Sequence, residues 1–194
     1  MPNYIEVQNQ RSGGAVKRSL VPMTALTVGS LAAQPVTVAQ YVWGGFVTLD
    51  FTLTAVPVTL TKNGTSTGGG GTLLFTFTEG LVLPIGGSSN LTIAAAGDKS
   101  FLASVGSAAA GTDGTLSSTE ISFLPSTAAT TSSNAGTCKM KSTSTTPTPG
   151  SPLDGSSTPV GLYLNSCLNA DATGVESLTF SGTIRIIAAV LGDN

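Results

Sequence analysis

The chain of 194 residues contains no histidine and few charged side chains. Charged residues make up 9% of the sequence, against about a quarter in an average soluble domain. Without histidine, the chain lacks the usual acid–base group at neutral pH and the commonest metal ligand. A serine or cysteine nucleophile would have no histidine base to activate it. The composition therefore argues against an enzyme and predicts neither a metal nor another cofactor.

Basic residues are also scarce, and they are unevenly distributed. The net charge is −2, which argues against nucleic-acid binding, because such surfaces carry clustered Lys and Arg. Residues 1–40 contain Arg11, Lys17 and Arg18 but one acidic residue, whereas the remainder contains five basic and nine acidic residues. The N-terminal segment is either a solvated tail or an arm that binds an acidic partner.

Long apolar runs and cysteines are few as well. No run approaches the ~20 apolar residues of a membrane-spanning helix, and the first residues do not resemble a secretory signal. The sequence thus predicts no membrane partner and synthesis in the cytoplasm. Cys138 and Cys167 are too few for an all-cysteine zinc site, and two unpaired thiols are favoured over a disulfide.

The residues that are abundant favour β-structure. The sequence contains 29 Thr, 23 Ser and 24 Gly, and 40% of it is hydrophobic. Threonine and valine favour strands, whereas the helix-favouring Lys, Glu, Arg and Gln are scarce. Short alternating segments with turn residues between them predict eight to ten strands. We therefore predict an all-β fold, a jelly-roll-like β-sandwich, with an immunoglobulin-like sandwich as the alternative.

The most informative pattern lies in residues 46–60. Apolar residues occupy the odd positions from Val47 to Leu53 and then the even positions from Val56 to Leu60. This one-residue slip predicts a β-bulge or strand break at residues 55–56. Pro57 supports it, because proline cannot donate to a strand ladder.

The domain organisation follows from the distribution of turn residues. Residues 1–40 are predicted to form an extended arm, and residues 41–194 a single β-sandwich domain. Glycines 68–71 are interpreted as a flexible hairpin loop, and residues 86–88 as a turn between two short strands. A further strand is predicted at residues 116–124. The Ser, Thr and Pro-rich stretch at about 125–159 is predicted to be a long loop outside the core.

Acidic and aromatic residues are the remaining candidates for a site. Because the acidic residues stand singly beside turn residues, turn chemistry explains them better than a carboxylate pair or a calcium loop. These residues are Asp98, Asp113, Glu120, Asp154, Asp171 and Glu176. The single tryptophan, Trp43, fits a core or interface anchor better than a sugar platform.

The last apolar run, residues 186–191, has no polar face, so it predicts a strand covered on both sides. The cover is either the rest of the chain or a neighbouring subunit. The candidate subunit-interface residues are Trp43, Ile184, Ile186, Ile187, Val190 and Leu191.

Segments in residues 50–190 resemble, in order, the auxiliary capsid proteins of tailed bacteriophages, also called decoration or cement proteins. They begin with FTLTAVPV at residues 51–58 and FTFTEGLVLPIG at residues 75–86. The others are residues 105–120, 124–127, 153–158, 161–165, 169–171 and 178–183. Residues 1–40 and 128–152 depart from the family pattern.

The resemblance implies a jelly-roll-like domain on the outer surface of a virion. Such a protein is a homotrimer that binds the major capsid protein of an HK97-like shell and stabilises the shell. Arg11, Lys17 and Arg18 are then the candidate capsid contacts. The alternative function is a phage fibre or adhesin-type module that recognises a host-surface glycan.

Overall fold

The computed structural model describes residues 4–8, 18–22, 29–32, 34–43, 46–63, 67–77, 81–142, 153–154, 159–168 and 176–190. Within these ranges every regular element is a strand except one 3-10 helix, η1 (Ser118–Ile121). The prediction of an all-β fold is therefore confirmed.

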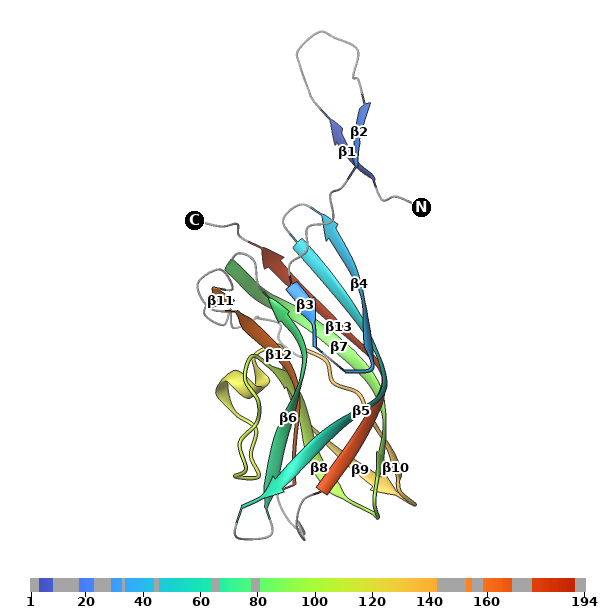
Figure 1. Ribbon diagram of the computed structural model, residues 1–194, viewed down its shortest axis with the longest axis vertical. Helices are drawn as coiled ribbons and strands as arrows, with labels where there is room; N and C mark the ends of the chain where they lie inside the picture. Colours follow the sequence, from blue (N-terminus) through green and yellow to red (C-terminus); the bar gives the residue numbers. More distant parts are fainter. Residues whose placement is uncertain are drawn as a thin grey trace.

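Eight antiparallel strands close into a barrel, shown in Figure 1. They are β5 (Phe46–Lys62), β6 (Gly68–Phe77), β7 (Leu81–Ala95), β8 (Ser100–Gly106), β9 (Leu124–Ser132), β10 (Ala135–Cys138), β12 (Val160–Leu168) and β13 (Glu176–Val190). Their order around the ring is β5-β6-β12-β8-β9-β10-β7-β13, and β13 pairs with β5. The sequence predicted two stacked sheets. The structure differs because β5 pairs with β6 and β9 pairs with β10, which joins the sheets on both sides.

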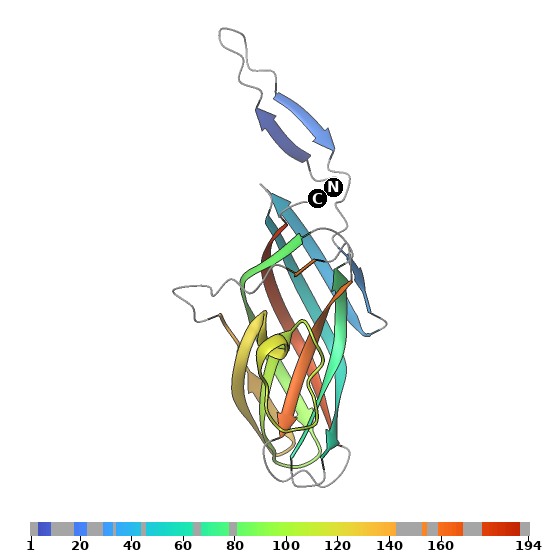
Figure 2. The same cartoon turned by 90° about the vertical axis from the view of Figure 1, so that its left-hand side faces the viewer.

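The remaining strands lie outside the ring. β3 (Gly29–Leu31) pairs with β6, β4 (Val36–Trp43) pairs with β5, and β11 (Leu153–Asp154) pairs with β7. β1 (Tyr4–Gln8) and β2 (Arg18–Pro22) pair only with each other among the described strands, above the barrel in Figure 2. The predicted arm of residues 1–40 thus includes β3 and part of β4, which pair with the barrel strands β6 and β5.

The predicted bulge in β5 is present. Buried side chains occupy odd positions up to Leu53 and even positions from Val56, and the register with β13 shifts opposite Ser181. Ala55 has a positive φ of 55°, and its N–H donates to Ser181 Oγ at 2.9 Å. The extra residue bends β5 from one side of the barrel to the other, as bulges do where a strand changes sheets.

The prediction of a flexible loop at residues 68–71 is wrong. These four glycines are the first residues of β6, where all four pair with β12 and the first two also pair with β5. Neighbouring backbone approaches them closely, since a Cβ on Gly69 or Gly70 would overlap the carbonyl oxygen of Gly111 or Thr59 respectively. Glycine is used here for its small size rather than for flexibility.

Three other local predictions are also corrected. Residues 86–88 do not form a turn but lie within β7, where a register shift against β13 marks a bulge. Residues 116–124 form η1 and the start of β9 rather than one strand. Residues 124–138 contribute β9 and β10 to the barrel although Ser and Thr dominate them, because alternate residues such as Ala129 and Cys138 are buried.

Large apolar side chains fill the barrel. Phe51, Phe75, Phe101 and Phe180 are each at most 2% exposed, and Phe51 meets Phe75 edge-to-face at 5.7 Å between ring centroids. Such aromatic contacts add to the stabilisation from burial. The barrel is a packed core, so the functional surface is sought on its outside.

Candidate functional site

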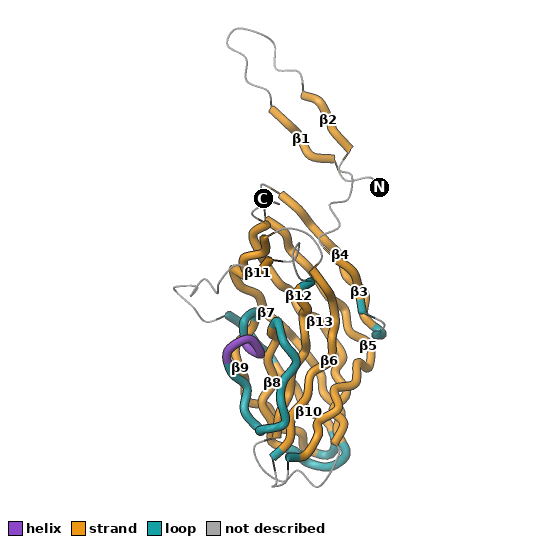
Figure 3. Tube along the Cα trace, turned by 60° about the vertical axis from the view of Figure 1, so that its left-hand side comes forward, coloured by secondary structure: helices purple, strands orange, loops and turns teal. Residues whose placement is uncertain are grey.

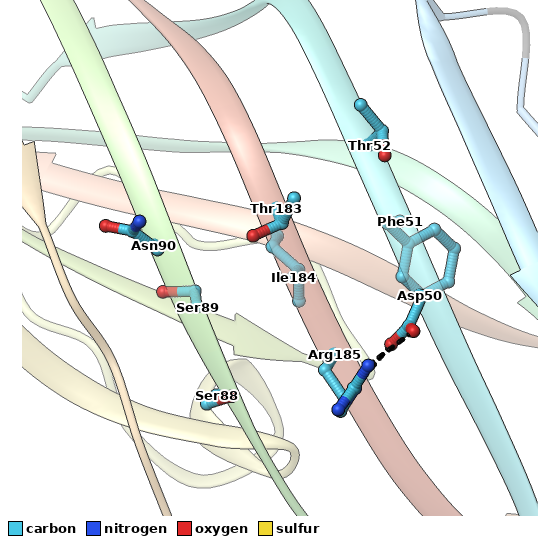
Figure 4. Close-up of a pocket in the computed structure, with 9 residues that line it drawn as sticks. All are labelled: Asp50, Phe51, Thr52, Ser88, Ser89, Asn90, Thr183, Ile184 and Arg185. Atoms are coloured by element: carbon cyan, nitrogen blue, oxygen red, sulfur yellow. Dashed lines mark hydrogen bonds and ion pairs between the residues drawn. The ribbon is translucent and has the colours of Figure 1, made fainter.

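A shallow depression lies on the outer face of three adjacent strands, β5, β13 and β7 (Figure 4). Its volume is about 360 Å³. We call it the polar trough and define it by Asp50, Thr52, Ser88, Asn90, Thr183 and Arg185. Phe51, Ser89 and Ile184 also line it, although their side chains are mostly buried.

An ion pair occupies one side of the polar trough. Arg185 Nε donates to Asp50 Oδ1 and Arg185 Nη2 donates to Asp50 Oδ2, each at 2.6 Å. The two residues are directly opposite in the β5–β13 register, which holds the two planar groups in a bidentate arrangement. The hydrogen bond from Arg185 lowers the pKa of Asp50, and the carboxylate in turn raises the pKa of Arg185. Both groups stay partly exposed, at 57% for Arg185 and 28% for Asp50.

Four other polar side chains of the polar trough have no hydrogen-bond partner among the described residues: Thr52, Ser88, Asn90 and Thr183. Two other side chains of β7, by contrast, form hydrogen bonds within the chain. Ser89 Oγ accepts the N–H of Met140 at 3.0 Å, and Thr92 Oγ1 donates to the Ser181 carbonyl at 3.3 Å. The polar trough therefore gathers hydroxyl and amide groups that are free to bind a ligand from solution.

Two bulges bracket the polar trough along β13. One lies opposite Ser181 and the other lies between Ile187 and Ala188, with Thr183 and Arg185 between them. Bulges increase the local twist of a sheet and re-aim the neighbouring side chains. The two bulges therefore lie at the two ends of the polar trough along β13.

An apolar strip adjoins the polar trough toward the β4–β5 turn. We define the apolar strip as Tyr41, Phe46, Ile187 and Leu83. Tyr41 is 53% exposed and Phe46 is 38% exposed, and Ile187 and Leu83 are half-buried. In the strand register, Thr48 of β5 lies between Tyr41 of β4 and Ile187 of β13. Ala189 of β13 lies between Phe46 of β5 and Leu83 of β7. The same outer face thus has an apolar end and a polar centre.

The predicted interface residues fall into three groups. Ile184 and Ile186 are each 1% exposed and belong to the core of this chain, so the chain itself covers them and they cannot contact a subunit. Ile187 alternates to the outer face and is part of the apolar strip. Trp43 and Val190 lie in β4 and β13, but their side chains are outside the described part, as is residue Leu191 altogether.

The predicted capsid contacts lie in the N-terminal segment. Arg18 is the first residue of β2 and pairs with Gln8. Arg11 and Lys17 lie outside the described residues.

The acidic residues in the loop between β8 and β9 have the turn role that the sequence predicted. Glu120 accepts the N–H of Gly111 at 2.9 Å and of Ser117 at 2.8 Å, and Asp113 accepts that of Thr115 at 3.2 Å. Figure 3 shows this loop, with η1, against β8 and β9. Across the described ranges, no three His, Cys, Asp or Glu side chains are grouped so as to hold a metal ion.

The two cysteines are unpaired and buried, as the sequence favoured. Burial raises the pKa of each thiol to about 11, so both stay protonated at neutral pH. Protonated, enclosed thiols are poor nucleophiles. We therefore assign Cys138 and Cys167 to packing.

Sequence reasoning did not single out the polar trough. Alternation places Asp50 and Thr52 on the outer face of their strand, but it does not say which strands lie beside it. Asn90 and Arg185 come from strands 40 and 135 positions away along the chain from Asp50. Only the register between β5, β13 and β7 brings the three together.

No family model matches the chain, and comparison with curated proteins and with solved structures finds no match. Among the helices of the described residues, none has the length and apolar character to cross a membrane.

Proposed function

We propose that the protein is a cement protein of a tailed-phage capsid, which binds the outer surface of the major capsid protein shell and stabilises it. Two observations support this function. The sequence segments of residues 50–190 resemble the auxiliary capsid proteins in order. The order in which the barrel strands pair, considered next, supports the assignment of the barrel to a fold that is used by viral capsid proteins, and this observation carries the proposal.

The barrel, in our proposal, is a jelly roll. Its eight strands pair in a nested way: β5 with β13, β6 with β12, β7 with β10, and β8 with β9. The first strand thus pairs with the last, and the turn between β8 and β9 is the midpoint. Rolling such a doubled ribbon produces the two interlocked Greek keys of a jelly roll, a fold of viral capsid domains and lectins.

The apolar strip is the proposed contact between copies in a homotrimer. Exposed aromatic residues beside an arginine are the composition of interface centres, and Tyr41 and Phe46 are the exposed aromatics here. Trp43, which pairs with Phe46 in register, is retained as a candidate on sequence grounds. Ile187 belongs to the same contact.

The stabilising mechanism is mass action. A protein that binds the assembled shell and not its separated subunits lowers the free energy of the assembly by an amount that rises with its concentration. Three linked copies that each make a weak contact bind together far more tightly than one, through effective concentration. The basic residues Arg11, Lys17 and Arg18 supply the proposed contact with the shell.

The test is co-sedimentation of the purified chain with expanded, DNA-free shells of the phage that encodes it, with unexpanded shells as the comparison. We expect saturable binding to expanded shells. Removing residues 1–20 should lower the occupancy at equal protein concentration. No binding to expanded shells would contradict the proposed function, and unchanged occupancy after the deletion would contradict the role of the arm.

A further inference from the structure

We propose that the polar trough is a binding site for a neutral saccharide, through a pyranose ring that bears vicinal hydroxyls. This site is separate from the apolar strip and from the N-terminal arm, to which the capsid function is assigned. It would allow a capsid-bound protein to hold glycans at a cell surface.

The first argument is hydrogen-bonding complementarity. Each sugar hydroxyl both donates and accepts, so a site for a diol needs donors and acceptors side by side. Asp50 supplies an acceptor and Arg185 a donor within one ion pair. Asn90 supplies both kinds of group on the facing strand, and its side chain has no partner among the described residues. Thr52, Ser88 and Thr183 add hydroxyls between these two sides.

The second argument is the charge of the polar trough. Asp50 and Arg185 neutralise each other, and the remaining members are uncharged. The nearest further charges by register are Lys141, opposite Ser88, and Lys139, opposite Asn90, on the other side of β7. A phosphate or carboxylate ligand would have to compete with Asp50 for Arg185. The ion pair therefore favours a neutral ligand at the centre of the polar trough, and the anionic probes test whether the two lysines bind an anion instead.

The third argument is the position of the polar trough relative to the proposed contact between copies. No defining residue of the polar trough belongs to the apolar strip, and Tyr41 of the apolar strip lies opposite Thr48 rather than opposite Asp50 in the register of β4 and β5. The polar trough and the apolar strip are thus distinct surfaces of one outer face.

The fourth argument is preorganisation. The defining residues lie on adjacent strands in the middle of a sheet, bracketed by two bulges, so little conformational entropy is lost on binding. The volume of about 360 Å³ lies within the usual range of ligand pockets, about 300–1,000 Å³. Because the polar trough is shallow, we expect a dissociation constant of about 1 mM for one monosaccharide.

The experiment is a titration of the full-length chain, followed by amide chemical shifts, with the methyl glycosides of glucose, galactose and mannose. Glucuronate and inorganic phosphate serve as anionic probes. We expect at least one neutral glycoside to shift resonances of β5, β7 and β13 in a saturable way. Shifts with anions alone, or with none of the neutral glycosides at millimolar concentrations, would overturn the proposal.

Two variants locate the site. Asn90→Ala removes an exposed side chain without a described hydrogen bond, so we expect normal folding and a loss of about tenfold in affinity. Thr59→Ala, at an exposed position of β5 outside the polar trough, is the matched control and should bind like the parent chain. Equal affinity in all three proteins would overturn the assignment. Co-sedimentation of Asn90→Ala with expanded shells should be unchanged, which separates a failure of this proposal from a failure of the capsid function.

Discussion

At the scale of single residues, one buried amide organises the longest described loop of the barrel. Asn165 is fully buried on β12. Its Oδ1 accepts the N–H of Ala110, and its Nδ2 donates to the carbonyls of Ala108 and Glu120, all at 2.9 Å. These three bonds attach residues 107–123 to the barrel wall.

The first prediction follows from this arrangement. Asn165→Ala leaves the N–H of Ala110 and the carbonyl of Ala108 without that partner, while the Glu120 carbonyl keeps the Ser104 hydroxyl, and each buried unsatisfied group costs about 1–3 kcal/mol. We expect a loss of about 3 kcal/mol in the free energy of unfolding, measured by urea denaturation. Asn90→Ala, the exposed control, should change it by less than about 0.5 kcal/mol. Equal losses in both variants would contradict the role of Asn165.

The second residue-scale prediction concerns pH. Because Arg185 lowers the pKa of Asp50 in the folded chain, the ion pair contributes stability at pH values above the unfolded pKa of about 3.9. This contribution is lost as the pH falls through the lower folded pKa.

Asp50→Asn removes the titrating group, so the stability difference between it and the parent chain should shrink as the sample is acidified below about pH 3.9. Urea denaturation at a series of pH values measures this difference. It is expected to be small, since the pair is exposed to solvent. A difference that does not vary with pH would contradict the linkage.

At the scale of elements, the sequence predicted most strands from alternation, and the parity change in β5 located a real bulge. Prediction from the sequence failed where the packing of backbone against backbone decides the structure. Glycines 68–71 look like a loop because nothing in the sequence shows that β5 and Gly111 lie against them. Residues 124–138 look like a loop because their buried positions carry small residues. The polar trough could not be predicted for the same reason, since it depends on register between distant strands.

The third prediction tests the close packing of β6. Gly70→Ala would force a Cβ into the carbonyl oxygen of Thr59, and overpacking that backbone must absorb costs about 3 kcal/mol or more. We expect a large fall in the midpoint of thermal unfolding or a failure to fold. Gly111→Ala is the matched control, because its Cβ would meet only Glu120 Oε1, at 4.0 Å. If both variants melted alike, the account of the glycine run would be wrong.

At the scale of the whole molecule, the nested pairing of strands brings the two halves of the chain together around one core. β5 and β13 pair along most of their lengths, so the proposed jelly roll forms only when distant segments meet. The outer face of β4, β5, β13 and β7 then carries both surfaces to which we assign functions. In our proposals the apolar strip serves assembly and the polar trough serves ligand binding.

The fourth prediction concerns assembly. Replacing both Tyr41 and Phe46 with serine removes the exposed aromatics of the apolar strip, while the core residues beneath them are unchanged. Light scattering coupled to gel filtration should give the mass of a trimer for the parent chain and of a monomer for the double variant. Asn90→Ala should remain a trimer. A parent chain that is monomeric at all concentrations would contradict the apolar strip as a contact between copies in solution.

The thermal stability of expanded, DNA-free shells as a function of added protein tests the central claim most directly. Mass action predicts that the temperature at which shells disassemble rises with protein concentration as the binding sites fill. Unexpanded shells should not respond. An unchanged disassembly temperature for expanded shells, at concentrations that saturate any binding, would contradict the assignment of a cement function.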